Sequence, residues 1–447
     1  MNRRILGVEL RRSVAPWISA LVLLLTLGLF YLLSAPWTKG SVAWDEQLYA
    51  TTRWLRFMLV FLWPLAVGAG ALQGLRDHRS RMVELLTSTP RPALHRTAGT
   101  AGAIGLLLAT AYLLLTAIGG VQALAGDGYL SATWVPTALV GVLGLVAGAW
   151  LGLGIGRTIP SPLVPPLLSV VALVAMIPLS IEDNGIPYRV SLLSPSLAPL
   201  DNVFTAVAPA ANAGQALWLA GLAATGVLLA TASTVRTRLA ALLPVALSAA
   251  LATAVLPSTA SETYVVDAAA AEQVCDGDVC ASRVHEARLP LLAGPGEDAL
   301  RLLAKLPDAP TTVREHTGEV PRIGPRPRSA DAVTYVFDEW RFAKPTGTDL
   351  TRILVAGAGL PPCYGLNTAG VVVQREHVAR LVTAAWFTGE LKPLVGSNYL
   401  NGGAMADAER TWATFRTLPG TEQLARVQAA RRIGVSCEGD QWEALTG

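Results

Sequence analysis

Residues 1–257 of this 447-residue chain carry very few charged side chains, and this shortage excludes an ordinary soluble protein. Charged residues make up 15% of the whole chain, whereas typical soluble domains contain about 25%. Most of the charge lies in residues 258–447, whose composition is that of a globular domain. The sequence therefore predicts an all-α polytopic membrane bundle over residues 1–257, followed by a soluble α+β domain over residues 258–447.

Several catalytic and cofactor-binding motifs are also missing. No GxxxxGK[ST] loop occurs, so the chain cannot by itself cradle the phosphates of ATP, and no GxSxG motif occurs either. The sequence HEARL at 285–289 begins like a zinc-protease motif, but Leu289 stands where the second histidine would be needed. Asp276 and Asp278 alone are too few oxygen ligands for calcium. We therefore expect no enzyme activity, no cofactor, no metal and no nucleic-acid partner.

Cysteine is scarce, and all of it lies in the soluble domain, at Cys275, Cys280, Cys363 and Cys437. An even number of cysteines confined to one polar domain favours disulfides in an oxidising compartment. A metal site is the competing interpretation, although no familiar zinc spacing is completed. The cysteines allow three pairings, and the sequence leaves the choice open.

The membrane part contains about seven apolar runs, each with roughly the 20 residues that cross a bilayer. They are Val14 to Leu33, Trp54 to Leu75, Ala98 to Leu124, Trp134 to Ile155, Leu163 to Ile181, Ala213 to Ser233 and Leu239 to Leu256. Arginines precede the first run and follow the second, fourth and sixth runs. The positive-inside rule then predicts a plasma-membrane protein with a cytosolic N-terminus and an extracytoplasmic C-terminal domain.

The predicted spans themselves contain almost no ionisable residue, and Arg56 is expected near the mouth of the second span. Ion-coupled transporters usually keep a buried carboxylate, histidine or lysine as a relay, so proton- or sodium-driven transport is disfavoured. Glycines such as Gly70 and Gly152 are spaced to let helices approach closely. The proline-rich loop after the fifth span could return into the membrane as a short helix over Phe204 to Ala211.

The largest group of charged side chains in the first half of the chain lies in one short stretch, Arg76 to Thr97. A helix from Asp77 to Thr87 would have an apolar side and a polar side, and Pro90 would end it. Such a helix could be the docking place of a soluble partner. It could equally lie on anionic lipid through its arginines.

The order of these features resembles a known family. A basic amphipathic start (GVELRRS, 7–13), two spans, the sequence ELLTSTPRP (84–92) and four further spans resemble the permease subunits of type 2 ATP-binding-cassette transporters, especially actinobacterial ones. The resemblance implies that residues near 77–88 form a coupling helix that docks on a separate P-loop ATPase subunit. The implied docking residues are Met82, Glu84, Leu85, Leu86, Pro90 and Arg91. It also implies membrane lipid around the bundle and a second permease copy.

The chain departs from that family in having an additional span and residues 258–447 beyond it. The stretch VCDGDVCASRVHEARLPLL resembles a domain that recurs at the end of actinobacterial permease-like proteins. We expect strands at 263–266, 333–337, 353–357 and 371–374 and helices over 285–306, 376–387, 404–416 and 421–432, with a break at Gly294–Gly296.

Two functions are consistent with these sequence features. The first is the membrane subunit of an ATP-binding-cassette exporter that moves a hydrophobic or amphipathic substrate. The alternative is a cell-envelope binding or sensing protein that a degenerate permease bundle anchors. A membrane-bound enzyme is disfavoured because no nucleophile–base or metal constellation appears.

Overall fold

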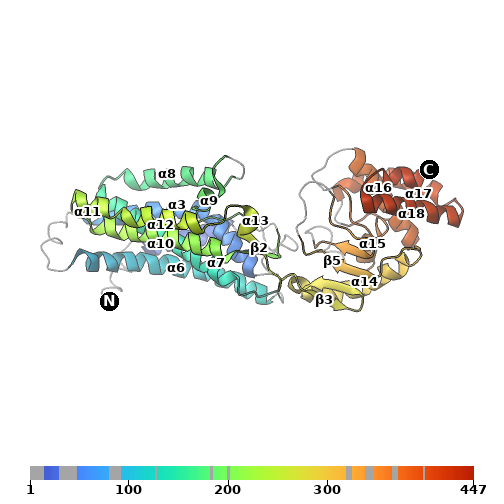
Figure 1. Cartoon of the computed structure of the whole chain (residues 1–447), viewed down its shortest axis with the longest axis horizontal. Coiled ribbons are helices and arrows are strands. Elements are labelled where there is room, and N and C mark those ends of the chain that lie inside the picture. Colours follow the sequence, from blue (N-terminus) through green and yellow to red (C-terminus); the bar gives the residue numbers. More distant parts are fainter. Residues whose placement is uncertain are drawn as a thin grey trace.

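A bundle of helices and a mixed helix–sheet lobe lie at opposite ends of the long axis of the molecule (Figure 1). We call residues 15–255 the bundle and residues 273–447 the C-terminal lobe. The computed structural model describes residues 15–29, 48–79, 92–125, 128–181, 185–198, 202–318, 325–337, 347–364, 371–395 and 398–447.

The described part of the bundle consists mainly of apolar helices. They are α2 (Ala15–Leu29), α3 (Leu48–Gly74), α4 (Arg76–Arg79), α6 (Ala93–Ala125), α7 (Trp134–Thr158), α8 (Val164–Leu179), α9 (Tyr188–Ser191), α10 (Pro209–Thr231), α11 (Val235–Ala240) and α12 (Leu243–Val255). Five helical stretches are long and apolar enough to cross a membrane: Leu48–Gly74, Ala93–Ala125, Trp134–Thr158, Pro209–Thr231 and Val235–Val255. Two shorter apolar helices, Pro16–Leu29 and Val164–Leu179, lie where the first and fifth spans were expected.

Helices α3 and α7 pack with their backbones almost in contact. A Cβ atom added to Gly70 would lie 1.9 Å from the carbonyl oxygen of Ala149. One added to Gly152 would lie 1.9 Å from the carbonyl oxygen of Val67. The prediction that these glycines permit close helix packing is therefore confirmed, and α3 and α7 form the tightest contact of the bundle.

The expected re-entrant helix over 204–211 is wrong. Residues Thr205–Val207 form a strand, β1, which pairs antiparallel with β2 (Tyr264–Val266) after α12 and the short helix α13 (Ala260–Thr263). The backbone N–H of Val207 donates to the hydroxyl oxygen of Tyr49, at 2.8 Å. Pairing with β2 satisfies the hydrogen-bonding groups of this extended backbone. Pro209 then begins α10, where the first N–H groups have no partner within the helix and a missing N–H therefore costs nothing.

The C-terminal lobe is built on a four-stranded sheet in the order β3-β4-β5-β6. The strands are β3 (Gln273–Asp276), β4 (Val279–Ser282), β5 (Thr312–Glu315) and β6 (Ala332–Tyr335). The first pair is antiparallel and the other two pairs are parallel. The helices are η4 (Arg283–Arg288), α14 (Leu289–Leu303), α15 (Thr348–Val355), α16 (Val371–Thr388), α17 (Asn398–Phe415), α18 (Gly420–Ser436) and α19 (Gln441–Thr446).

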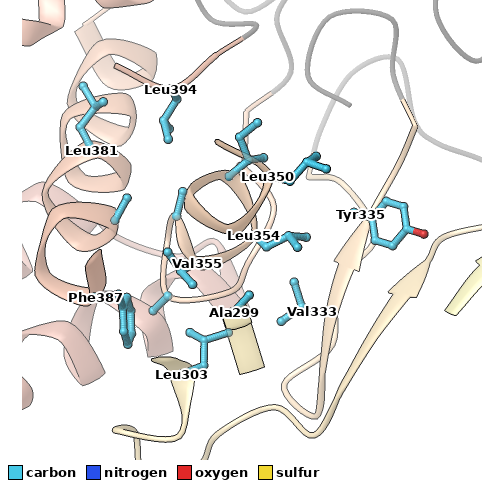
Figure 2. Close-up of a cluster of buried hydrophobic side chains, with 14 of the residues drawn as sticks. Ala299, Leu303, Val333, Tyr335, Leu350, Leu354, Val355, Leu381, Phe387 and Leu394 are labelled. Atoms are coloured by element: carbon cyan, nitrogen blue, oxygen red, sulfur yellow. The ribbon is translucent and has the colours of Figure 1, made fainter. Parts of the chain in front are cut away.

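The core of the lobe lies between this sheet and its helices (Figure 2). Leu303 of α14, Val333 of β6, Leu354 of α15 and Phe387 of α16 all belong to one buried cluster. Burial of such side chains contributes about 1.5–3 kcal/mol each. The lobe thus has a hydrophobic core of its own.

Two of the expected strands in the lobe are helical. Residues 353–357 include the end of α15, and residues 371–374 form the first turn of α16. Short runs of β-branched residues are ambiguous, and here Leu350 and Leu354, four positions apart, are both buried in the core. The break expected at Gly294–Gly296 is absent as well, because α14 continues through it and Gly296 leaves room for Val279 of β4.

Candidate functional site

The six residues predicted to dock an ATPase lie outside the described residues, as does the basic amphipathic start at 7–13. The six are Met82, Glu84, Leu85, Leu86, Pro90 and Arg91. The structure describes both flanks of the docking stretch: α3 ends at Gly74 and is followed by α4, and α6 begins at Ala93. The stretch therefore connects the C-terminal end of α3 to the N-terminal end of α6.

At the same end of the bundle, Arg157 ties three helices together. Its Nη1 donates to the hydroxyl of Thr97 on α6 at 2.7 Å and to the carbonyl of Ala230 on α10 at 3.5 Å. Arg157 itself is in the last turn of α7, where a cation is favourable at the negative end of the helix dipole. The N-terminal end of α6 and the C-terminal ends of α7 and α10 are thus joined by one side chain.

The other end of α3 carries a fully buried arginine, Arg56. Its Nε donates to the carbonyl of Pro195 at 2.9 Å, its Nη2 to the Oε1 of Gln215 at 2.8 Å, and its Nη1 to the carbonyl of Thr137 at 3.3 Å. We expected Arg56 near the mouth of the second span, and the structure shows instead that it is completely buried among α3, α7 and α10. Neutral oxygens satisfy the guanidinium, and no bond to a carboxylate of the described residues is present.

A second buried arginine, Arg53, lies one turn earlier on α3 and is only 2% exposed. Its Nη2 donates to the carbonyl of Ala198 at 2.7 Å, and its guanidinium lies over the ring of Tyr264, 4.5 Å from the centroid. Its Nε and Nη1 make no hydrogen bond within the described residues. Cations buried between membrane helices are costly and are usually kept for a function.

Gln215 of α10 completes this group. Its Nε2 donates to the carbonyls of Leu192 and Ser194, both at 3.0 Å. We call Arg53, Arg56 and Gln215 the loop clamp, because together they bind carbonyls of the loop 192–198. The sequence signal that could have located it is two arginines at i and i+3 inside an otherwise uncharged span.

Two residues just beyond the clamped loop contact the C-terminal lobe. Asn202, just beyond the loop, donates to the carbonyl of Gly318 at 3.3 Å. Phe204 accepts at its carbonyl from the N–H of Asp267 at 2.8 Å, and its ring meets His285 edge-on at 6.1 Å between centroids. Bundle and lobe are therefore in contact through Asn202 and Phe204, in addition to the covalent chain after α12.

His285, from the incomplete zinc-protease motif, is buried against the sheet of the lobe. Its Nδ1 lies 2.7 Å from the Oε1 of Glu315, and 3.1 Å from the hydroxyl of Ser282. A catalytic triad requires serine and carboxylate on opposite ring nitrogens, so this arrangement does not activate the serine. Within the described ranges, no three histidine, cysteine or acidic side chains are grouped as metal ligands.

The lobe contains two disulfides. Cys275 pairs with Cys280 across the β3–β4 hairpin, and Cys363 pairs with Cys437 at the end of α18. The sequence left the pairing open, and the structure selects this one of the three. Disulfides fit an oxidising, extracytoplasmic environment.

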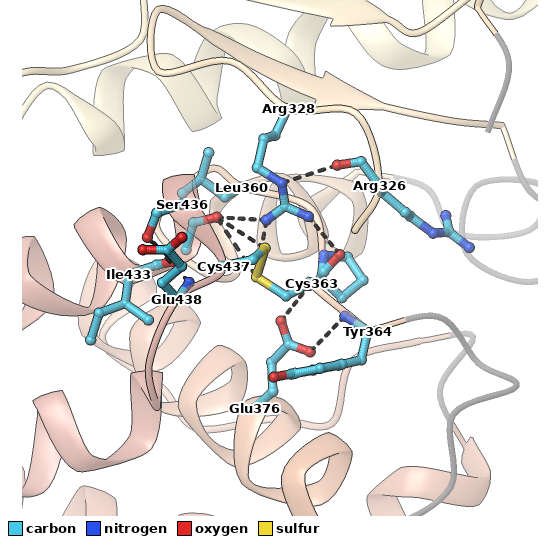
Figure 3. The surroundings of a disulfide bond; sticks show 12 residues. Arg326, Arg328, Leu360, Cys363, Tyr364, Glu376, Ile433, Ser436, Cys437 and Glu438 are labelled. Atoms are coloured by element: carbon cyan, nitrogen blue, oxygen red, sulfur yellow. Dashed lines mark hydrogen bonds between the residues drawn. A yellow bond between two sulfur atoms is a disulfide. The ribbon is translucent and has the colours of Figure 1, made fainter. Parts of the chain in front are cut away.

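Arg328 lies against the second disulfide (Figure 3). Its Nη1 donates to the carbonyl of Gly434 at 2.5 Å and approaches the Sγ of Cys363 at 3.1 Å, while its Nη2 donates to the carbonyl of Pro362 at 3.1 Å. Burial lowers the pKa of the Arg328 guanidinium. From the other side, the Glu376 carboxylate accepts the N–H of Cys363 at 2.5 Å.

Two further arginines hold the same irregular segment, residues 356–364. Arg380 donates to the carbonyl of Leu360 at 2.5 Å, and Arg431 donates to the carbonyls of Ala358 and Ala330. Burial lowers the pKa of Arg431. The segment contains positive φ angles at Gly357, Ala358 and Gly359, so it cannot make regular ladder bonds and takes its donors from arginines.

No protein-family model, no curated protein and no solved structure matches this chain. The functional interpretation is therefore built from the sequence and from the geometry of the loop clamp, the disulfides and the two ends of α3.

Proposed function

We propose that the chain is the membrane-spanning permease subunit of an ATP-binding-cassette exporter. A separate P-loop ATPase would dock on the stretch near 77–88, and a second permease copy would complete the pathway. The observation that supports this function best is the position of α3: its C-terminal end leads into the predicted docking stretch, and its N-terminal end carries the two arginines of the loop clamp.

Helix α3 has the length and the support needed to transmit a displacement. Its 27 residues span about 40 Å at 1.5 Å per residue. Backbone contacts at Gly70 and Gly152 hold it against α7, and tightly packed elements move as units instead of deforming. A push on the docking stretch would therefore reach Arg53 and Arg56 as a shift of the whole helix pair.

The loop clamp would convert that shift into a change at the opposite mouth. Arg56 binds Pro195 and Arg53 binds Ala198. Both acceptors are backbone carbonyls, which cannot follow a moving arginine by a side-chain rotation. Displacing α3 by a few tenths of an ångström already lengthens these bonds beyond good geometry. Loop 192–198 would then be released together with β1, which follows it.

The apolar outer faces of the bundle agree with surrounding lipid and with an apolar or amphipathic substrate. Leu167, Val170 and Val174 of α8 are exposed, as are Leu247 and Leu251 of α12. In water such faces would be costly, whereas lipid tails cover them without penalty. The disulfides of the C-terminal lobe support its placement on the extracytoplasmic side.

The deciding experiment is purification of the tagged full chain from its native host, followed by identification of bound proteins. We expect a stoichiometric P-loop ATPase. The double variant Glu84→Ala/Leu85→Ala should still insert into the membrane, but the amount of ATPase bound to it should fall at least tenfold. The matched control Glu297→Ala, at an exposed position of α14 in the lobe, should retain the bound ATPase.

A second variant separates docking from transmission. Arg56→Gln removes the charge and the long side chain that binds Pro195, Thr137 and Gln215, but leaves residues 77–88 intact. We expect the ATPase to remain bound and its hydrolysis to become insensitive to whatever substrate stimulates the wild type. If properly inserted wild-type protein carries no ATPase, the cell-envelope binding or sensing function replaces the exporter.

A further inference from the structure

The C-terminal lobe contains a cavity of about 490 Å³ among the helices α16, α17, α18 and α19. Its floor is apolar and includes the buried side chains of Val378, Phe415 and Leu445. Small-molecule sites typically enclose about 300–1,000 Å³ and combine an apolar lining with a few polar groups. The cavity therefore has the size of a binding site for a ligand of one or two rings.

The rim of the cavity carries three arginines, and each of them already has a carboxylate partner. Arg375 lies 3.2 Å from Asp440 and 3.7 Å from Glu443, measured between Nη1 and the carboxylate oxygens. Arg426 binds Glu422 at 2.6 Å. Arg410 binds Asp407, which also lines the cavity.

These pairs make the rim nearly neutral, with three cations set against four carboxylates. An anionic ligand would have to compete with carboxylates that are already bonded, and a cationic ligand would meet the arginines. A neutral ligand avoids both costs. Guanidinium and carboxylate groups that remain partly exposed can still donate to and accept from neutral hydroxyls.

The wall adds short polar side chains at close intervals. Thr411, Thr414 and Thr446 line the cavity, and Gln374 lines it from α16. The hydroxyls of Thr414 and Thr446 donate to carbonyls of their own helices and can still accept with their lone pairs, and the Gln374 amide has both donors and an acceptor. Such a wall is matched by a ligand whose edge carries several hydroxyl groups.

An aromatic ring completes the lining. The indole N–H of Trp442 donates to the hydroxyl of Thr411 at 3.3 Å, which fixes the ring in the wall. The guanidinium of Arg375 lies 5.0 Å from the ring centroid and covers part of it. A rigid aromatic surface next to dual donor–acceptor groups suits a ligand with an apolar C–H face and a polar edge.

We propose that this cavity is a binding site for a neutral saccharide of one or two sugar rings. The sugar's C–H face would pack on Phe415 and Trp442, and its hydroxyls would bond Arg410, Asp407 and the threonines. The proposal goes beyond the exporter function and does not depend on it, because the cavity lies wholly in the C-terminal lobe.

The test is isothermal titration of the full chain in lipid nanodiscs, since glycoside detergents would compete for the site. The probes are maltose, cellobiose, trehalose and diacetylchitobiose, with glucuronic acid as the charged comparison. We expect at least one neutral disaccharide to bind with a Kd on the order of 1 mM or tighter. Glucuronic acid should bind more weakly than that disaccharide.

Arg410→Gln should weaken this binding by about tenfold, since it removes a hydrogen bond from a charged donor. Thr414→Val, which keeps the side-chain shape, should weaken it severalfold. The matched control is Arg301→Gln, because Arg301 forms the same kind of exposed i,i+3 pair, with Asp298 of α14, outside the cavity lining. The Arg301→Gln variant should bind the disaccharide with the same affinity as the wild type.

Three results would overturn the proposal. The first is that none of the four disaccharides binds folded protein. The second is that glucuronic acid binds more tightly than every neutral sugar. The third is that both cavity variants bind like Arg301→Gln. Loss of ATPase association in the Glu84→Ala/Leu85→Ala variant concerns only the exporter function and leaves this outcome unaffected.

Discussion

In the bundle, α3 and α7 pack through glycines, and their backbones are almost in contact. In the C-terminal lobe, by contrast, large side chains such as Leu354 and Phe387 fill the space between the sheet and the helices. The difference follows from the solvent. Lipid tails are as apolar as leucine, so helices in a membrane gain little from burying large side chains and gain more from close contact. In water, burial of apolar area is the dominant stabilising term. The two regions should therefore respond differently to the same kind of substitution.

The two regions also share a device. Each holds an irregular loop by arginines that donate to backbone carbonyls: Arg53 and Arg56 hold 192–198, and Arg328, Arg380 and Arg431 hold 356–364. Buried carbonyls without ladder partners need donors in either environment. The lobe adds a disulfide to its loop, at Cys363, whereas the clamped loop of the bundle contains no cysteine. The lobe's loop is thus permanently fixed, and the bundle's loop is held only by bonds that can be broken and remade.

The largest expected effect tests the fixed loop of the lobe. The double variant Cys363→Ala/Cys437→Ala opens a loop with a sequence separation of 74 and should cost about 4 kcal/mol of lobe stability. Cys275→Ala/Cys280→Ala opens a separation of 5 and should cost about 2 kcal/mol on the same model. Hydrogen exchange of the amides of α18 in increasing urea measures both. Equal losses would show that loop length does not govern these bonds.

The next largest effect tests backbone contact in the bundle. Gly152→Ala places a Cβ atom 1.9 Å from the carbonyl of Val67 and should force α3 and α7 apart, at a cost of about 3 kcal/mol. The matched control is Gly99→Ala on α6, where an added Cβ meets nothing within 4 Å. Thermal unfolding followed by size-exclusion chromatography compares the two. A Gly152→Ala protein that unfolds like Gly99→Ala would contradict the close approach of α3 and α7.

An intermediate effect tests the arginine device. Arg328→Met keeps the length of the side chain but leaves the carbonyls of Gly434 and Pro362 without this donor, and should cost about 2 kcal/mol. The exposed Arg301→Gln serves again as control and should change stability by less than about 0.5 kcal/mol. The urea midpoint of the lobe is the measurement. If both variants shift it equally, the arginine does not stabilise the segment 356–364 through these bonds.

The smallest effect is a pH dependence of the lobe. Tyr335 is buried, its hydroxyl donates to the carbonyl of Cys280 at 2.9 Å, and burial raises its pKa well above 10.0. Above pH 10 the unfolded chain loses this phenolic proton while the folded chain keeps it, so stability should fall as pH rises from that point. Tyr335→Phe should cost about 1 kcal/mol at pH 7 and flatten the alkaline decline. Urea titrations at pH 7 to 11 compare the slopes, and identical slopes would exclude Tyr335 as the cause.

The sequence was informative where a property is local. Hydropathy located the apolar helices, because a membrane span requires a continuous run of apolar residues. The glycines of α3 and α7 were recognisable by their spacing, and the confinement of cysteine to residues 258–447 indicated disulfides there. The predicted strands at 353–357 and 371–374 were wrong, because a few β-branched residues do not distinguish a strand from a buried helix turn.

The loop clamp could not be derived in the same way. Arg56 finds its acceptor at Pro195, which is 139 residues away in the chain. The two arginines at i and i+3 mark the position, but neither the burial of Arg56 nor the identity of a backbone carbonyl as its partner can be read from periodicity or composition. The pairing of Cys363 with Cys437 depends likewise on how α18 folds back on the segment 356–364. Whether residues near 77–88 form the expected coupling helix stays a prediction.

The pairing of β1 with β2 has a mechanical consequence. Strand β1 belongs to the connection between α9 and α10, and β2 follows α12, so the chain leaves the bundle while still fastened to it. Ala270, farther along, is also buried in the cluster that includes Tyr49 of α3. The free tether between bundle and lobe thereby shrinks to the few residues before β3. The chain is therefore fixed to the bundle at two places after α12, and only a short segment before β3 is left to set the orientation of the lobe.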